Sequence, residues 1–581
     1  MVGICWGNTS RKVAFSFRYV RHWNVVSKRT IITQDRQLTR LASPALLLPK
    51  LKYSDEIFNY TRGRFVSDEK YELSQRHVRF NVNELARLAA DAVGAKVCVK
   101  VEKYPDGMYN KAMLLTMDSG IQVVAKVPNP NAGKPHFTTA SEVATMDFVR
   151  NVLKTPVPKV FAWSSSAQEN PVGAEYIIME KVPGIELERV WSSMKIADRF
   201  AVVKAIAGFQ KTWTSFSFKK FGSLYYAKDL DERHGLTPLF IDQNGIETHD
   251  SKFAIGPCTG RELLDNGRAA IEFNRGPWET VEEYHNAIGH REISCVNQVP
   301  CLPKSPITLC GPGTYQPTRE RKLKALACYL KLIKYLLPTD RSITSSHLWH
   351  SDLHVANIFV NPSNPVEIVG LIDWQSTELS PLYCHARQPH FIDYDGPPVN
   401  GLERPQPPKN IDRLDASAKK HAESLYLQQS LCSLYNTLTH KQTPQLYAAL
   451  EFQQTTSYLL LLLARNLLVD GEATYLSQVA ELEATWDTLP GAKGSAYPFS
   501  FSEAQRKEIE ADVEGAVRGM EAMHSIRESI GELFPEQGLV RPDQYEEALD
   551  ALEQIKDQVI EEFASNEQER DVWRKEWPFG T

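Results

Sequence analysis

Long apolar runs and an excess of basic charge are both missing from this 581-residue chain. No stretch of 18 or more uncharged apolar residues occurs, and the most apolar segment, at 458–463, is soon followed by Arg465. We therefore expect a buried helix there and no membrane span. The net charge is −5, so the chain has no overall positive field to attract nucleic acid. We expect no nucleic-acid partner.

Paired cysteines are missing as well. The nine cysteines are an odd number and form no C-x-x-C pair. Disulfide scaffolds and zinc sites both require more regularly spaced cysteines, so a reducing compartment is the simple interpretation. Cys295, Cys301 and Cys310 form the one loose group, and we interpret them as loop thiols without a metal.

Acidic residues are nearly missing from positions 1–50, where Asp35 stands against nine Lys or Arg. A basic, hydroxyl-rich and acid-poor start is typical of an organelle transit peptide, which predicts a mitochondrial protein. A disordered basic tail is the alternative. Residues 51–96 then form an N-terminal extension that ends in a predicted helix at 81–95. Asn81 or Asn83 would cap this helix and Gly94 would end it.

The most informative stretch is residues 348–375. His350, Asp352, His354 and Asn357 precede a short apolar run at 358–360, and a second run at 366–372 ends in Asp373. Turn-forming residues separate the two runs, which predicts a β-hairpin. The open ends of a hairpin meet, so Asp352, Asn357 and Asp373 should face one another.

This arrangement suits phosphoryl transfer. Magnesium prefers oxygen ligands and usually takes one or two carboxylates. Asp373 can supply a carboxylate oxygen, and Asn357 can supply an amide oxygen. Asp352 can accept a proton from an attacking hydroxyl. D-x-x-x-x-N followed by a later Asp is the spacing of the catalytic loop and the metal-binding Asp in protein-kinase-like enzymes. The alternative is a polar turn around a core histidine.

The region before this stretch is predicted to be rich in strands, at 97–101, 110–117, 122–127, 159–164 and 174–179. Lys126 lies near the end of the third strand, and Glu142 lies in the first turn of a helix predicted at 141–153. Lys126 and Glu142 could form an ion pair that anchors phosphate. Asp147 is a less favoured partner for Lys126. Gly107 and Asn110 are candidate phosphate contacts in a turn that has one glycine, and an ordinary hairpin turn is equally open.

Helices dominate the prediction after residue 180, at 194–213, 319–337, 415–487, 502–529 and 541–564. The segment 221–318 is rich in Gly, Pro, Asn and aromatic residues and predicts a functional loop or lid. Arg261, Arg275 and Trp278 are candidate acceptor contacts within it. The expected fold is α+β, with a small β-rich N-lobe at 97–180 and a large helical C-lobe at 181–581.

Five motifs carry a resemblance to the aminoglycoside phosphotransferase and choline kinase-like kinases, which have a two-lobed protein-kinase-like fold. They are V-V-A-K (123–126), Glu142, M-E-K-V-P-G (179–184), H-S-D-L-H-V-A-N (350–357) and I-D-W (372–374). Further segments such as Y-T-R-G-R-F (60–65) and R-G-P-W (275–278) resemble the fungal altered inheritance of mitochondria protein 9 group.

The resemblance implies that ATP and Mg²⁺ bind between the lobes. It implies that Asp352 is the catalytic base, that Asn357 and Asp373 hold the metal, and that Lys126 with Glu142 anchors phosphate. The backbone at Met179, Glu180 and Val182 would bind adenine. His350, His354 and Trp374 would be structural, and Ser351 stands where many relatives have Gly.

We therefore expect an ATP-dependent phosphotransferase that acts on a hydroxyl of an unidentified small molecule. The alternative is a catalytically idle kinase-fold protein that binds nucleotide or a partner. G-x-G-x-x-G and A-P-E motifs are absent, which argues against a protein kinase.

Overall fold

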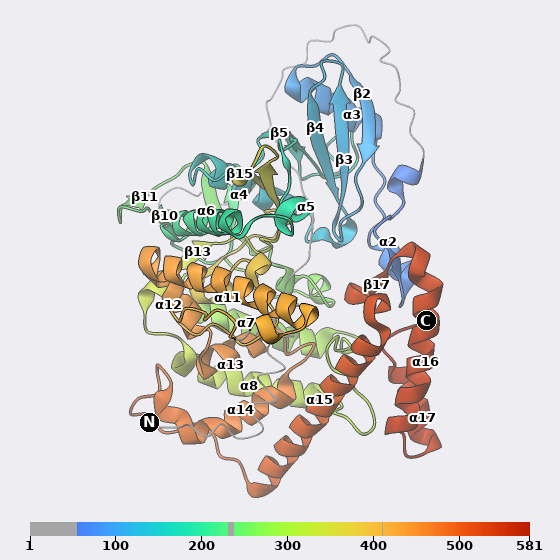
Figure 1. The fold of residues 1–581 in the computed structure, drawn as a ribbon, viewed down its shortest axis with the longest axis vertical. Helices are drawn as coiled ribbons and strands as arrows, with labels where there is room; N and C mark the ends of the chain where they lie inside the picture. Colours follow the sequence, from blue (N-terminus) through green and yellow to red (C-terminus); the bar gives the residue numbers. More distant parts are fainter. Residues whose placement is uncertain (1–54, 231–237, 410, 581) are drawn as a thin grey trace.

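The computed structural model of the protein describes residues 55–230, 238–409 and 411–580. Strands gather in the N-terminal part of this chain and helices dominate the C-terminal part (Figure 1). The fold is therefore α+β, as predicted. The expected transit segment 1–50 lies outside the described residues. Within the described ranges, no helix combines the length and apolar character that crossing a membrane requires.

An antiparallel five-stranded sheet forms the N-lobe. Its strands, in spatial order, are β2 (Cys98–Lys103), β3 (Asn110–Met117), β4 (Gln122–Pro128), β6 (Tyr176–Glu180) and β5 (Val160–Ser164). All five predicted strands are confirmed to within a few residues. Side chains alternate along β4: Val123, Ala125 and Val127 join the core under helix α3 (Val82–Val93), and Val124 joins the core on the opposite face.

The two helices on the sheet differ in how well the sequence placed them. Helix α3 is capped by the Asn81 side chain and ends at Gly94, whose φ of 72° suits a residue without a Cβ. Helix α4 (Phe137–Asn151) begins four residues before the predicted start. Glu142 therefore lies in the second turn, and the helix dipole is not what places a carboxylate there.

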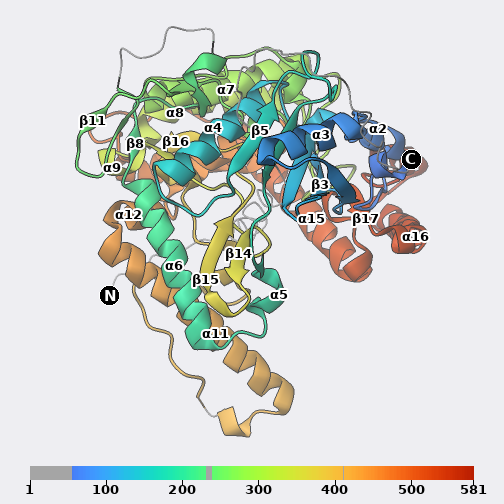
Figure 2. The same cartoon turned by 90° about the horizontal axis from the view of Figure 1, so that it is seen from above.

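The predicted hairpin in the C-lobe is present. Strands β14 (Ile358–Asn361) and β15 (Asn364–Leu371) pair antiparallel, with Ile358 opposite Leu371. The turn is tighter than predicted, because Asn364 and Pro365 already belong to β15. Strand β7 (Ile185–Glu186) pairs with β14, and helix α6 (Ile196–Thr214) runs alongside β15 (Figure 2).

The segment 221–318 is more ordered than its composition indicated. It contains helix α7 (Val281–Gln298), which begins with a complete capping box at Thr280 and Glu283. This helix buries His285, Arg291 and Glu292 and packs against α8 (Arg319–Leu336). A large part of the segment is thus core: α7 is a helix where the composition predicted a loop, and a functional role for the segment as a lid stays a prediction. Short strands precede it: β9 (Ser223–Tyr226), β10 (Phe240–Ile241), β11 (Glu247–Thr248) and β12 (Phe253–Gly256).

The remaining C-lobe is mostly helical, as predicted. Its longer helices are α11 (Ala416–Gln442), α12 (Pro444–Phe452), α13 (Thr456–Ala464), α14 (Glu472–Thr485), α15 (Glu503–Ile530), α16 (Tyr545–Phe563) and α17 (Glu567–Glu576). A small antiparallel sheet joins β8 (Ser217–Phe218), β13 (Ser346–Leu348) and β16 (Leu379–Pro381) to β10 and β11.

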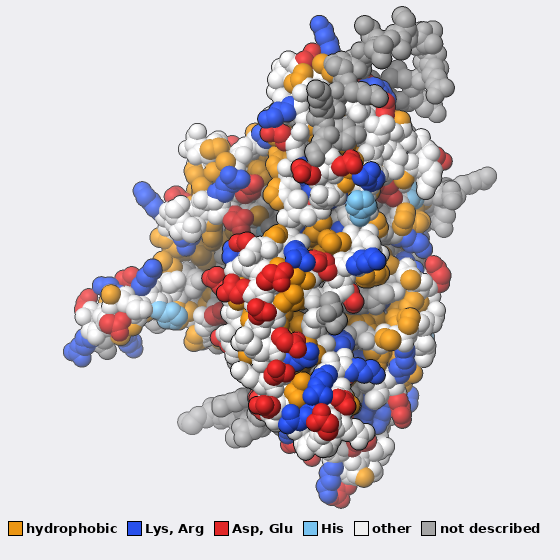
Figure 3. All heavy atoms as spheres, turned by 90° about the vertical axis from the view of Figure 1, so that its right-hand side faces the viewer, with side chains coloured by type: hydrophobic (Ala, Val, Ile, Leu, Met, Phe, Trp, Pro, Cys, Tyr) orange, Lys and Arg blue, Asp and Glu red, His pale blue; other side chains and the backbone are white. Residues whose placement is uncertain are grey.

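Two segments that are far apart in the sequence meet beside the N-lobe. Strand β1 (Arg64–Phe65) pairs with β17 (Leu539–Val540), and Val66 joins the core of α16 and α17. Figure 1 shows α16 and α17 as a separate arm below α2 (Glu69–Ser74). The outer face of the arm carries both acidic and basic side chains (Figure 3).

Candidate active site

His350 connects the two ends of the hairpin. Its Nε2 lies 2.9 Å from the Ile372 carbonyl oxygen, and its Nδ1 accepts from the Asp352 backbone N–H at 3.2 Å. The ring is fully buried, and burial lowers the pKa of His350 to about 4. A neutral ring protonated on Nε2 serves both contacts. The residue before Asp373 is thereby joined to Asp352 itself.

Asp352 and Asn357 face each other within the loop 350–357. Asn357 Nδ2 donates to the Asp352 carbonyl oxygen at 2.9 Å and to Asp352 Oδ2 at 3.4 Å. Asn357 Oδ1 is buried and accepts no hydrogen bond from the described residues. His354 Nε2 lies 3.5 Å from Asp352 Oδ2. The loop therefore presents one carboxylate and one amide oxygen side by side.

Asp373 follows β15 in an unusual backbone conformation. Its φ is 69°, in the left-handed region that non-glycine residues seldom occupy. Such conformations persist only where the surroundings enforce them, and they cluster at functional sites. Trp374 supplies part of that enforcement, because it is fully buried with its ring against His350 at 4.5 Å and Trp213 at 5.5 Å.

Lys126 and Glu142 meet behind the sheet. Lys126 Nζ lies 3.3 Å from Glu142 Oε2, and both side chains are almost completely buried. Asp147 is turned elsewhere, because it bonds to Tyr226 Oη and Lys252 Nζ. Burial lowers the pKa of Lys126 well below its usual value, and the negative charge of Asp373 offsets part of this fall. The predicted pair is thus in place, and Asp373 is close enough to affect Lys126 electrostatically.

Gln375 is a site residue that the sequence analysis missed. Its Oε1 accepts from Lys126 Nζ at 3.0 Å and from Asn110 Nδ2 at 2.7 Å. Its Nε2 donates to the Ala132 carbonyl oxygen at 3.2 Å. The only signal in the sequence was its position two residues after Asp373, and nothing in the pattern assigned it a contact with the sheet.

The turn between β2 and β3 is held by contacts with the N-terminal extension, which lies outside the N-lobe sheet. Gly107 is buried in this turn, and its N–H donates to the Asn110 carbonyl oxygen. Asp106 bonds to Lys111 and Lys103 and accepts from the backbone and hydroxyl of Thr61. The Asn110 side chain thus contacts Gln375 of the C-lobe, whereas the Asp106 end of the turn contacts the N-terminal extension.

Val182, in the segment expected to bind adenine, packs closely against Gly370. Met179 and Val182 are buried, and a Cβ added at Gly370 would lie 2.4 Å from Val182 Cγ1. The Glu180 N–H donates to the Lys159 carbonyl oxygen at 2.8 Å. Of the three residues, Glu180 thus has its N–H committed to the sheet.

Arg387 is a second residue that the sequence analysis missed. Its guanidinium donates to the Ser351 carbonyl oxygen. Desolvation lowers the pKa of Arg387, and the nearby carboxylates of Asp352 and Asp393 raise it. The Arg387 cation therefore lies near Asp352 and is bonded to Ser351, the residue that stands where many members of the resembled family have Gly.

The candidate acceptor contacts are mostly used for structure. Arg275 is buried and donates to the carbonyl oxygens of Arg268 and Ile271. Trp278 is buried against Tyr284. Arg261 binds Asp265 and the carbonyl oxygens of Asn131 and Ala132. Arg261 is the one of the three that approaches the Gln375 contact at Ala132.

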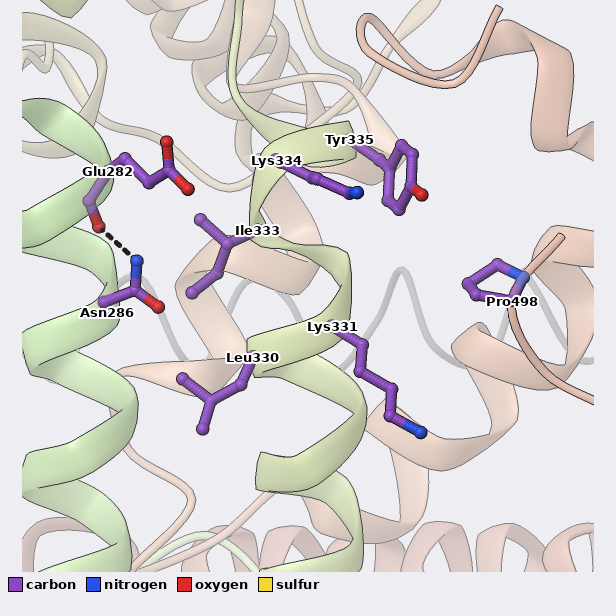
Figure 4. A pocket seen from close by; sticks show the side chains of 8 residues that line it. All are labelled: Glu282, Asn286, Leu330, Lys331, Ile333, Lys334, Tyr335 and Pro498. Atoms are coloured by element: carbon purple, nitrogen blue, oxygen red, sulfur yellow. Dashed lines mark hydrogen bonds between the residues drawn. The ribbon is translucent and has the colours of Figure 1, made fainter. Parts of the chain in front are cut away.

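Two hollows lie elsewhere. One is a surface groove between α7 and α8, lined by Glu282, Asn286, Leu330, Lys331, Ile333, Lys334, Tyr335 and Pro498 (Figure 4). The other is a small cavity that Glu262, Glu378, Trp278 and Tyr284 help to line. Trp278, a candidate acceptor contact, lines the second, whereas none of the residues predicted to bind nucleotide or metal, nor Asp352, lines either hollow.

Comparison with known proteins gives relatives at low identity. No family model matches the chain. A subtelomeric hrmA-associated cluster protein of Aspergillus fumigatus is 28% identical over 510 residues, which cover 83% of this chain and 97% of the relative. The altered inheritance of mitochondria protein 9, mitochondrial, of Yarrowia lipolytica is 24% identical over 67% of this chain and 69% of its own length. The protein of the same name from Eremothecium gossypii is 25% identical over 64% of this chain and 70% of its own length.

Solved structures give a fold-level comparison. The aminoglycoside phosphotransferase APH(4)-Ia in a ternary complex with AMP-PNP and hygromycin B is 12% identical, with a TM-score of 0.31, over 75% of this chain and 98% of that chain. A putative fructosamine-3-kinase from Thermobifida fusca is 13% identical, with a TM-score of 0.32, over 68% and 99%. The relatives from Yarrowia lipolytica and Eremothecium gossypii agree with the resemblance found in the sequence motifs.

Proposed function

We propose that the protein is an ATP-dependent phosphotransferase that moves the γ-phosphoryl group of MgATP to a hydroxyl of a small-molecule acceptor. One observation carries the proposal: Asp373, at the end of the hairpin that His350 connects to Asp352, lies near Lys126 of the Lys126–Glu142 pair, and Gln375, two residues later, hydrogen-bonds Lys126 Nζ. Kinase-like enzymes need these two halves together, because one half places the acceptor and metal and the other holds phosphate.

Mitochondrial localisation is part of the proposal. The basic, acid-poor segment 1–50 has the composition of a transit peptide. Relatives from Yarrowia lipolytica, Eremothecium gossypii and Meyerozyma guilliermondii carry the word mitochondrial in their names. Both observations support the same compartment.

The residues present fit a magnesium ion. Asn357 Oδ1 is a buried acceptor that no donor of the described chain meets, and Asp373 adds a carboxylate. These are hard oxygen donors of the kind that Mg²⁺ takes alongside phosphate oxygens. When bound, the ion would neutralise phosphate charge in the transition state. Asn357 and Asp373 would hold it.

In the proposed reaction Asp352 orients the acceptor hydroxyl and takes its proton. The hydroxyl oxygen forms a bond to the γ-phosphorus, and the bond from that phosphorus to the bridging β–γ oxygen breaks, so that ADP leaves. Lys126 binds phosphate oxygens and Glu142 holds Lys126 in place. Asn357 fixes the rotamer of Asp352 through its Nδ2 contacts. Arg387 offsets the charge of Asp352 from the side of Ser351.

A second candidate is an idle kinase-fold protein that binds a partner. Gln375 favours it, because its amide already bonds to Lys126 and Asn110, the groups expected to receive phosphate. The complete set of Lys126, Glu142, Asp352, Asn357 and Asp373 favours the enzyme, because loss of activity in evolution usually removes one of them.

The two candidates differ in what Asp352 contributes. We would measure MgATP binding and ATP hydrolysis for the chain lacking residues 1–50, for Asp352→Asn and for Asp373→Ala. The control is Asp543→Asn, whose side chain is 77% exposed. For the enzyme, Asp352→Asn should lower turnover by roughly 10²- to 10⁴-fold and leave MgATP affinity intact. Asp373→Ala should remove the Mg²⁺-dependent part of binding.

The contrary outcomes are distinct. Hydrolysis by Asp352→Asn at the wild-type rate would contradict the catalytic role and leave a binding protein. Absence of MgATP binding by the wild-type chain would overturn the phosphotransferase proposal. The Asp543→Asn control should match the wild type in both measurements.

A further inference from the structure

Gln375 bonds to two residues that we propose bind phosphate. Its side chain is 7% exposed and is held at three points: by Lys126 Nζ and Asn110 Nδ2 at its oxygen, and by the Ala132 carbonyl oxygen at its nitrogen. Lys126 belongs to β4, Asn110 begins β3, and Ala132 lies in the turn after β4. One side chain from the C-lobe thus cross-links three parts of the N-lobe.

The chemistry of these contacts resembles that of a phosphate. The Gln375 amide oxygen accepts from an ammonium and from a side-chain amide at once, as a phosphate oxygen would. A charged phosphate oxygen makes stronger, charge-assisted bonds to the same donors. The ammonium of Lys126 has three N–H donors, and Glu142 and Gln375 already use two of them in a fully buried position.

The backbone around Gln375 is set in an uncommon shape. Asp373 has φ of 69° and Ser376 has φ of 55°, so left-handed non-glycine residues stand on both sides of it. Thr377 Oγ1 donates to the Trp374 carbonyl oxygen across this bend. Conformations of this kind are held by their surroundings and change when the surrounding contacts change.

We infer that the Gln375 side chain is a built-in competitor of the nucleotide: it occupies the phosphate anchor formed by Lys126 and Asn110 and must leave when MgATP binds. This inference rests on the proposed function and deepens it. Because the open form is only part of the population, the apparent affinity for nucleotide is lower than the intrinsic affinity of the open site. Departure of Gln375 also releases the cross-link between the lobes.

Two substitutions at this position should act in opposite directions. Gln375→Ala removes the competitor and should tighten MgATP binding by about tenfold. Gln375→Glu keeps the size and places a carboxylate beside Lys126, so it should weaken MgATP binding by about tenfold. Gln442→Ala, at the exposed end of α11, is the control and should bind as the wild type does.

A second measurement needs no nucleotide. The rate at which acetic anhydride acetylates Lys126, followed by peptide mass spectrometry, reports how open the anchor is. Acetylation should be faster than wild type in Gln375→Ala and slower in Gln375→Glu. Acetylation of exposed Lys100, in β2, should be the same in all chains.

The outcomes separate the two proposals. Unchanged MgATP affinity and unchanged Lys126 acetylation in both variants would overturn the competition and leave the phosphotransferase proposal standing. Faster acetylation in Gln375→Ala with no MgATP binding by any chain would overturn the phosphotransferase proposal, and the competition with it. Weaker MgATP binding by Gln375→Ala would make Gln375 a nucleotide ligand and would also overturn the inference.

Discussion

At His350, two ring nitrogens serve two different segments of the chain. One faces the Ile372 carbonyl oxygen and the other accepts from the Asp352 N–H. Because the ring is buried, neither backbone group can turn to water if the ring is lost. A single residue therefore fixes the distance between Asp352 and the strand that ends before Asp373.

His350→Phe tests this role. The substitution fills the space but leaves one buried N–H and one buried carbonyl without a partner, each of which costs about 1–3 kcal/mol. We expect the free energy of unfolding, measured with urea, to fall by roughly 2–4 kcal/mol. His421→Phe, on an exposed part of α11, is the control and should change it by less than about 0.5 kcal/mol. A similar, small effect of both substitutions would contradict the bridging role.

At the scale of elements, residues 59–66 act as a strap over the turn between β2 and β3. Thr61 bonds to Asp106, and the Asn59 carbonyl oxygen accepts from Lys111. The same segment continues into β1, which pairs with β17 of the C-terminal arm. The turn that carries Asn110 is thus held by an element outside the N-lobe sheet.

Asp106→Asn should loosen this strap. The Asp106 and Lys111 side chains are both fully buried and 3.1 Å apart, and Lys103 lies 2.7 Å from the same carboxylate. Removing the negative charge leaves two lysines together, which costs about 3–5 kcal/mol for a buried pair. Urea unfolding would measure the loss, and hydrogen exchange would show faster exchange at 104–110.

The exposed pair of Asp543 and Arg541, 3.8 Å apart, provides the matched comparison. Asp543→Asn should change stability by less than about 1 kcal/mol, because exposed ion pairs contribute little. Unchanged exchange at 104–110 in Asp106→Asn would show that the turn keeps its shape without the strap.

At the scale of the whole molecule, several buried histidines stay neutral. Burial lowers the pKa of His285 to about 3 and those of His347 and His350 to about 4. In the unfolded chain each titrates near the ordinary value of about 6.5. Between about pH 4 and pH 6.5, their neutral form is therefore favoured in the folded state and their charged form in the unfolded chain.

Stability should depend on pH accordingly. Each of these histidines has a folded pKa below its unfolded pKa, so the unfolded chain binds more protons as pH falls below about 6.5. The stabilisation is complete above that pH and is progressively lost toward about pH 4, by up to about 3 kcal/mol per histidine. We expect the melting temperature to fall steeply from pH 6.5 to 4.5.

His347→Gln isolates one contribution. His347 Nδ1 lies 2.8 Å from the Phe216 carbonyl oxygen, and a glutamine amide can donate to the same oxygen without taking up a proton. The fall in melting temperature from pH 6.5 to 4.5 should be smaller in His347→Gln than in the wild type. The exposed control His421→Gln should keep the full fall. Equal slopes in all three chains would contradict the assignment.

The sequence by itself determined the elements and the local half of the site. Alternation placed the strands of the sheet, and Asn81 and Gly94 marked the ends of α3. The apolar runs at 358–360 and 366–372, with turn formers between them, predicted one hairpin with Asp352, Asn357 and Asp373 at its open end. These features depend on backbone conformation and hydrogen bonds over a few residues, which local sequence encodes.

Only the tertiary structure decided which distant residues share the site. Lys126 and Gln375 are 249 positions apart, and Asn110 and Gln375 are 265 apart. The strap likewise joins Arg64 to Val540. Such contacts depend on how the two lobes pack, and a glutamine after Asp373 or an arginine after α10 (Leu382–His385) has no local pattern that names its partner. The physical reason is that packing brings these side chains together, whereas periodicity and turn chemistry act only along the chain.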